Sequence, residues 1–247
     1  MKKTALMLSL VLLCLSLFAC APQPVPIEGV DAIRAVVLDC IPKTDNLACL
    51  STPVWGQAVT GDTFLVRRDG ENLRYTAATQ DGRERTLTIV GDTAYLYEKT
   101  PATEEGALPV ETGATRTLSP DELAAARALY TATPLSADGL CALLLSGEES
   151  AFRMPDGKTQ LLSKNPSAAL LSEHTGYTFS ADACDLFGVL DTQGRLVYLR
   201  VTGRATAPDG AESALYLEYA LSYESLTVTP PEGAAGYAAG DFAVPLD

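Results

Sequence analysis

Along much of the chain, apolar and polar residues alternate with a period of two, which is typical of strands that bury one face of a sheet. Asp-Gly and Gly-Asp pairs separate the first alternating segments, and such pairs suit tight hairpin turns between neighbouring strands. We therefore expect an antiparallel meander. Its strands are predicted over residues 63–68, 73–79, 85–90 and 93–97.

A second group of strands is predicted from about Ser150 onward, with hairpin turns at Gly157, Gly194 and Gly210. Its clearest alternation runs from Leu215 to Tyr223, where leucine and tyrosine side chains fall on one face and smaller or charged ones on the other. This segment is predicted to be a strand with one buried face, and a pair of prolines further on ends the ladder.

Short helices are predicted before and between the two groups of strands. Ser119 is expected to begin one helix, because its hydroxyl can cap the first free amides and Glu122 can reach back. Another helix is expected to open near Ser136, with Leu140, Leu143 and Leu144 before Gly147. Further helical segments are predicted over residues 30–38, with Val30, Ile33, Val37 and Leu38 on one side, and over 167–173. The turn-rich segments 39–53 and 99–118 are expected to be loops.

The beginning of the chain has the pattern of a secretory signal. Lys2 and Lys3 precede an apolar run over residues 5–18, which is too short to span a bilayer. The run ends in Leu17-Phe18-Ala19-Cys20, which resembles the bacterial lipobox, in which the cysteine is acylated and becomes the first mature residue. The alternative is a plain signal peptide cleaved near Ala19, which would leave Cys20 as an ordinary thiol.

These features divide the chain into three parts. Residues 1–19 are the expected lipoprotein signal peptide, residues 20–29 the lipidated Cys20 with a proline-rich tether, and residues 30–247 a single domain. Alternating prolines favour an extended, semi-rigid spacer. We expect an exported protein held through its lipid on the outer face of the cytoplasmic membrane, or on the outer membrane if the host has one.

Composition narrows the range of functions. The formal net charge of −13 argues against nucleic acid as a partner, because phosphate binding needs a clustered basic face. His174 is the single histidine, which weakens any hypothesis of a histidine-containing triad or a multi-histidine metal site. No GxSxG, SxxK, HExxH or P-loop motif occurs. We expect no enzymatic activity, no cofactor and no metal.

Four cysteines remain after the signal peptide and Cys20 are set aside. They are Cys40, Cys49, Cys141 and Cys184, an even number in an exported chain, and disulfides are therefore expected. Three pairings are possible; we favour Cys40–Cys49 across a short local loop, with Cys141–Cys184 as the second bond. Four reduced thiols, as in an anaerobic organism, are the alternative.

The order of segments indicates an α+β fold, in which short helices pack on the concave face of a single curved antiparallel sheet, an unclosed half-barrel of about eight to eleven strands. This order, and above all residues 194–201 and 215–228 followed by Pro230-Pro231, resembles the lipoprotein carrier superfamily of Lol-type carriers and mycobacterial LppX-type lipoproteins. The resemblance implies an apolar cavity beneath the helices and non-catalytic binding of a lipid or another apolar molecule. Four mature cysteines and a lipid anchor set this chain apart from the soluble carriers.

Two functions follow as hypotheses. The first is a lipoprotein that binds or carries a lipid or another apolar ligand, with Trp55 either at the cavity mouth or packed on the first helix. The second is an interaction lipoprotein with a filled core, which docks a cell-envelope protein through a sheet face, an edge strand or residues 99–118. The candidate ligand-lining residues are Phe64, Val66, Leu73, Tyr75, Leu87, Ile89, Leu215, Leu217, Tyr219 and Leu221.

Overall fold

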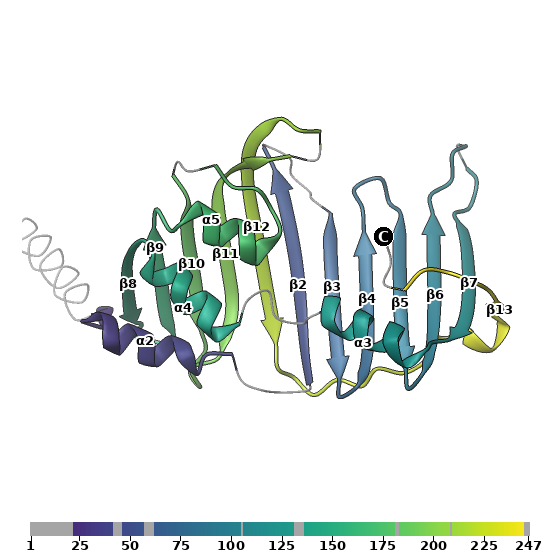
Figure 1. Ribbon diagram of the computed structural model, residues 1–247, viewed down its shortest axis with the longest axis horizontal. Helices are drawn as coiled ribbons and strands as arrows, with labels where there is room; N and C mark the ends of the chain where they lie inside the picture. The colour runs from purple at the N-terminus through teal and green to yellow at the C-terminus, as the bar shows by residue number, and fades with distance from the viewer. Residues whose placement is uncertain are drawn as a thin grey trace, which may run out of the picture.

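The computed structural model describes residues 22–41, 46–56, 62–104, 106–130, 136–180, 183–207 and 209–244, which form one wide, unclosed sheet with helices on one side (Figure 1). The strands are β1 (Val25–Pro26), β2 (Asn46–Trp55), β3 (Thr63–Asp69), β4 (Asn72–Ala78), β5 (Glu84–Val90), β6 (Thr93–Thr100), β7 (Val110–Thr117), β8 (Glu148–Arg153), β9 (Thr159–Lys164), β10 (Asp185–Leu190), β11 (Leu196–Thr206), β12 (Glu212–Ser222) and β13 (Ala238–Ala239). Their order across the sheet is β1-β8-β9-β10-β11-β12-β2-β3-β4-β5-β6-β7-β13.

The predicted α+β class and the single curved sheet are confirmed, and both groups of strands occur where the alternation placed them. The sheet is larger than predicted, with 13 strands among the described residues. It is also not wholly antiparallel, because β13 pairs with β7 in parallel. The extra strands are the two short edge strands, β1 and β13, and two longer ones, β2 and β7, in segments that were predicted to be loops.

The prediction of a turn-rich stretch over residues 39–53 is wrong, because β2 lies in the middle of the sheet between β12 and β3. Its partner β12 is far along the chain, so no local hairpin signal marks the pairing. Pro53 is tolerated because the pairing of β2 with β3 ends at Ser51, beyond which an amide facing β3 has no strand partner. The predicted loop over 99–118 is likewise interrupted by β7, which pairs with β6.

All four predicted helical segments are helices, and they cover one face of the sheet (Figure 1). Ser119 and Glu122 form a full capping box at the start of the first mid-chain helix, as its sequence indicated. Only Ile33 and Val37 of the first helix are buried, whereas Val30 and Leu38, predicted to share their side, are exposed. The helices are α2 (Val30–Leu38), α3 (Pro120–Leu129), α4 (Ala137–Leu145) and α5 (Ala168–Thr175).

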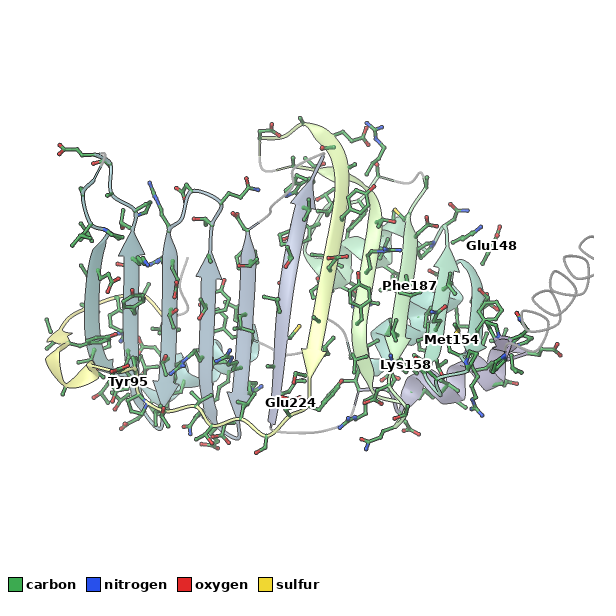
Figure 2. All side chains as sticks on the ribbon, turned by 180° about the vertical axis from the view of Figure 1, so that it is seen from behind. Tyr95, Glu148, Met154, Lys158, Phe187 and Glu224 are labelled. Atoms are coloured by element: carbon green, nitrogen blue, oxygen red, sulfur yellow. The ribbon has the colours of Figure 1, made fainter. Side chains whose placement is uncertain are left out.

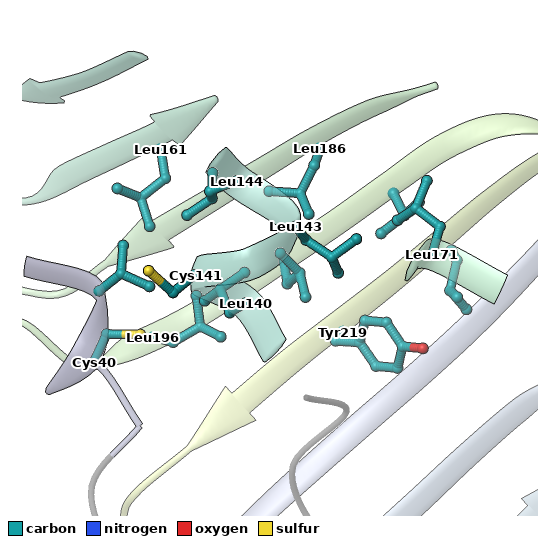
Figure 3. Packing of buried hydrophobic residues seen from close by; sticks show 14 of the residues in the cluster. Cys40, Leu140, Cys141, Leu143, Leu144, Leu161, Leu171, Leu186, Leu196 and Tyr219 are labelled. Carbon is teal, nitrogen blue, oxygen red and sulfur yellow. The ribbon is translucent and has the colours of Figure 1, made fainter. Parts of the chain in front are cut away.

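The helix-covered face carries two separate apolar cores. The larger lies under α2, α4 and α5, where Leu140, Leu143 and Leu144 of α4 meet leucines of β9 to β11 (Figure 3). The smaller lies under α3, where Ala126 packs over Leu87 of β5 and its neighbours. The two cores are held together by the strand pairs β11–β12, β12–β2 and β2–β3, because each helix reaches only its own part of the sheet.

Among the described residues no α-helix covers the opposite face of the sheet, which carries alternate side chains of the same strands (Figure 2). After β12 the chain crosses the lower ends of the strands toward β7; we call residues 223–244 the C-terminal strap. Arg74 Nη2 donates a hydrogen bond to the Thr229 carbonyl oxygen at 2.9 Å. Beyond β13 the strap turns around the edge of the sheet, and Phe242 and Val244 pack into the core under α3.

Candidate functional site

The ten candidate ligand-lining residues all lie on the helix-covered face. Leu73, Leu87, Ile89, Leu215 and Leu217 have at most 1% of their surface exposed and belong to the two cores. Leu221 and Tyr219 are also buried, whereas Phe64, Val66 and Tyr75 keep part of their surface accessible. That these residues line a cavity stays a prediction. The partly accessible ones gather between the two cores, where the helix cover of one core meets that of the other.

Aromatic side chains concentrate in this region, which we call the aromatic seam (Trp55, Phe64, Tyr75, Tyr130, Tyr177 and Tyr219). Tyr75 stacks on Tyr130 with ring centroids 4.4 Å apart, and Phe64 stacks on Tyr75 at 6.4 Å. Trp55 meets the edge of Tyr177 at 5.9 Å. The seam therefore joins the end of α3, through Tyr130, and the end of α5, through Tyr177, to four central strands of the sheet.

The tyrosine hydroxyls of the seam lie in a poorly solvated environment. Burial raises the pKa of Tyr75 to about 12, and the neighbouring Tyr130 adds to the shift. Burial also raises the pKa values of Tyr177 and Tyr219, and Tyr177 contributes to the shift of Tyr219. All of these rings stay neutral at physiological pH, so the seam offers apolar ring faces with uncharged hydroxyls at their rims.

Ser51 is a small residue between the large aromatic rings of the seam. In the strand register, Tyr219 of β12 lies directly opposite Ser51 of β2, and Ser51 lies directly opposite Phe64 of β3. A small side chain therefore stands between two large rings on the same face, and it remains partly accessible. Figure 3 shows the Tyr219 hydroxyl pointing away from α4, toward β2. An apolar chain laid across this point would contact rings on both sides without displacing either core.

Sequence reasoning found only part of the seam. It named Phe64, Tyr75 and Tyr219 from the alternation along their strands. The local pattern does not identify Ser51, because it predicts a turn-rich segment over residues 39–53. It does not identify Tyr177 either, which follows α5 outside any helix or strand. Trp55 packs against the larger core, which includes Ile33 and Val37 of α2, and it contacts Tyr177. The signal that could have placed Ser51 is the alternation Leu47, Cys49, Ser51 within β2.

The expected disulfides are absent from the structure: the four cysteines of the described residues are free and buried. A Cys40–Cys49 bond is predicted across a local loop, but Cys49 belongs to β2, whereas Cys40 follows the end of α2 and lies beside Cys141 of α4 (Figure 3). Cys184 packs beneath β11 at Gly203, so it is not paired with Cys141 either. Burial raises the pKa of the Cys40 and Cys49 thiols to about 12, which suppresses their thiolate chemistry.

The predicted lipidation site and signal peptide lie outside the described residues, because the description begins at residue 22. Among the described residues no group of three or more His, Cys, Asp or Glu side chains is arranged to hold a metal ion. In the same part of the chain, no helix has the length and apolar character required to cross a bilayer. Comparison of the sequence with protein-family models and with curated proteins finds no match.

Proposed function

We propose that this protein is an exported, lipid-anchored binding protein without catalytic activity, and that it holds a lipid or another apolar molecule at the aromatic seam. The observation that carries the proposal is the seam itself. The helices cover the two apolar cores, but several aromatic rings between the cores, around Ser51, remain partly accessible. Partly accessible rings that flank a small residue are suited to an acyl chain or a similar apolar body.

The proposed lipid anchor agrees with this role. Acylation at Cys20 and the tether over residues 20–29 would hold the domain beside a membrane, where apolar ligands are concentrated. The acidic character of the chain would repel anionic headgroups, so the anchor rather than surface adsorption would keep the domain there. The protein would then take up ligand while tethered.

Trp55 makes the proposal directly testable, because it is the single tryptophan and belongs to the seam. A soluble form, residues 22–247, is titrated with a fatty acid and with a phospholipid below its aggregation concentration. Binding is expected to shift the Trp55 emission and to appear as an added mass in native mass spectrometry. An unchanged emission spectrum together with a clean apo mass would overturn the proposal.

A matched pair of variants separates the seam from the rest of the sheet. Ser51→Phe fills the space between Tyr219 and Phe64, and it is expected to abolish ligand uptake while leaving both cores intact. Thr52→Phe places the same ring one residue along on the uncovered face and is expected to bind like the parent. If both variants bind equally, the ligand site is elsewhere.

The second candidate, docking of a cell-envelope protein, is favoured by one observation on the uncovered face. Tyr216 and Leu50 expose 48% and 40% of their surfaces on the central strands β12 and β2, where no helix covers them. The predicted docking loop also exposes Leu108 at 85%. Cross-linking on intact cells, with Tyr216→Ser and Leu108→Ser compared to the parent, tests this candidate; the same cross-linked species from all three proteins would argue against it.

A further inference from the structure

A hollow of about 370 Å³ lies on the uncovered face, between the sheet and the C-terminal strap. Its floor is built from residues of β3 to β6 that alternate with the core residues under α3. Leu65, Thr76, Thr86 and Tyr97 face one another across these four strands. The hydroxyls of Thr76 and Thr86 share a hydrogen bond at 3.0 Å, so the middle of the floor is polar and ordered.

Two arginines stand side by side at one end of the hollow. Arg67 of β3 and Arg74 of β4 are directly opposite in the register, on the same face, and both line the hollow. Like charges in this position destabilise a sheet. Burial and the charge of Arg67 both lower the pKa of Arg74. Among the described residues neither arginine forms an ion pair, so no carboxylate in direct contact offsets this repulsion.

Arg74 is nevertheless held in place. Its Nη2 donates to the Thr229 carbonyl oxygen of the strap, and its Nε donates to Thr88 Oγ1 at 3.3 Å. These bonds use the Nε and Nη2 donors of the guanidinium, and no described carboxylate forms an ion pair with the group. Paired guanidinium groups of this kind are the preferred protein ligands of carboxylate and phosphate, because each can offer two parallel N–H donors.

The other end of the hollow is aromatic. Tyr237 of the strap lies over Gly113 of β7, where a Cβ atom would collide with its ring. Gly113 is directly opposite Tyr97, so the two tyrosines bound the hollow together. Tyr237 is also fixed by an edge contact with Tyr95, at 6.5 Å between centroids. The strap therefore places an aromatic wall at a fixed distance from the arginine pair.

Glu84 and Glu232 complete the lining with hydrogen-bond acceptors. Glu84 accepts a hydrogen bond from Thr86 Oγ1 at 3.3 Å, and Glu232 comes from the strap. With two arginines and two glutamates, the charges of the hollow are balanced as a whole but separated along its length. A ligand that fits this distribution carries one anionic group and a body rich in hydroxyl groups, and it presents an apolar ring face to the tyrosines.

We propose that this hollow binds a small polyhydroxylated ligand with a carboxylate or phosphate group, that is, a sugar acid or a sugar phosphate. Arg67 and Arg74 bind the anion, the threonine hydroxyls and Glu84 bind the ligand hydroxyls, and Tyr97 and Tyr237 contact the ring. The step is binding alone, and no bond is made or broken. The site is on the face opposite the aromatic seam and does not depend on the proposed apolar ligand.

Isothermal titration calorimetry of the purified full chain tests this site with four probes: glucuronic acid, a glucose phosphate ester, inorganic phosphate and glucose. At least one charged sugar is expected to bind, and glucose is expected to bind much more weakly. The charged sugar that binds identifies the anion as carboxylate or phosphate. If inorganic phosphate binds as tightly as the sugar phosphate, the sugar-contacting part of the proposal is overturned. If no charged probe binds, the whole site is overturned.

Three variants locate the binding. Arg67→Gln removes one guanidinium without breaking a bond to the strap, and it is expected to weaken binding about tenfold or more, the loss typical of a charge-assisted hydrogen bond. Arg204→Gln is the matched control, because Arg204 of β11 also lies on the uncovered face of the sheet but forms an ion pair with Glu212 and does not line the hollow. Ser51→Phe, in the seam, is expected to bind the sugar normally. Equal binding by the Arg67 and Arg204 variants would refute the assignment.

Discussion

Gly203 of β11 provides a quantitative test of the larger core. A methyl group on this residue would lie 2.7 Å from Cys184 Sγ and 3.1 Å from Phe179 Cδ1, and both neighbours are buried. Overpacking of a filled core costs about 1–3 kcal/mol. Alanine is favoured over glycine in a strand by about 0.5–1 kcal/mol, which offsets part of this loss. Gly203→Ala should therefore lower the free energy of unfolding by about 1–2 kcal/mol.

Gly188 of the neighbouring β10 is the matched control, because its added methyl would meet Leu161 at an ordinary 3.5 Å. Gly188→Ala should leave stability unchanged or raise it slightly. Urea unfolding followed by far-UV circular dichroism measures both variants, with the slope of the transition compared to confirm that only stability has changed. Cys184→Ala removes the sulfur that the new methyl group would meet. The double variant Gly203→Ala, Cys184→Ala is therefore expected to lose less free energy of unfolding than the sum of the losses of the two single variants.

The reasoning would be refuted if Gly203→Ala were as stable as Gly188→Ala, or if the two changes at Gly203 and Cys184 were simply additive. Either result would mean that Cys184 and Phe179 move aside at little cost. The core beneath β10 and β11 would then be more loosely packed than its burial indicates.

Three further predictions concern titration and the strap. The thiols of Cys40 and Cys49 should react with a thiol reagent only after unfolding, as followed by mass spectrometry with and without urea. Because burial raises the pKa of these thiols from an ordinary value of 9.0 to about 12, the unfolded chain ionises first. The stability that the two neutral thiols contribute should therefore be fully present below pH 9 and be lost between pH 9 and 12, as measured by urea unfolding. The Arg116 side chain and the Ser119 amide lower the pKa of Glu122 from its ordinary value of 4.5 to about 2. The stability that the Glu122 carboxylate contributes is therefore present above pH 4.5 and lost as the pH falls toward 2. Glu122→Gln should flatten this loss of stability in acid, as measured by urea unfolding. Gly113→Ala should displace Tyr237, speed limited proteolysis of the strap and weaken sugar binding, whereas Gly236→Ala, which meets no atom and needs no positive φ, should leave sugar binding unchanged.

Local patterns proved sufficient for much of this fold. The Gly70, Gly82 and Gly91 turns have the positive φ angles that their hairpins require, and the Ser119 capping box forms as its spacing indicated. The misplaced elements depend on distant partners. β2 is a strand because β12, more than a hundred and fifty residues later, lies beside it, and no periodicity reports such a pairing.

The candidate sites were less accessible to sequence reasoning for the same reason. The ring of Tyr219 was identified from its strand, but its relation to Ser51 depends on the β12–β2 register. Arg67 and Arg74 read as ordinary polar positions of two strands, and only the hairpin register and the crossing of the strap reveal them as a pair facing a hollow. When the role of a side chain depends on a residue far away in the sequence, no local sequence pattern identifies it.

With the proposed lipid anchor at one edge of the sheet, the width of the sheet would set how far from the membrane each candidate site lies. The segment 20–29 contains β1, at one edge of the sheet, whereas Arg74 lies on β4, eight strand positions away in the sheet order. At about 4.8 Å between neighbouring strands, this separation is about 40 Å along the sheet. In the proposed lipid-anchored protein, the hollow would therefore stand well clear of the headgroup layer, within the aqueous space where soluble sugars or the ends of surface polysaccharides occur. The seam strands β12 and β2 lie four to five strands closer to the tether than β6, the far wall of the hollow, so this part of the seam would remain nearer the lipid.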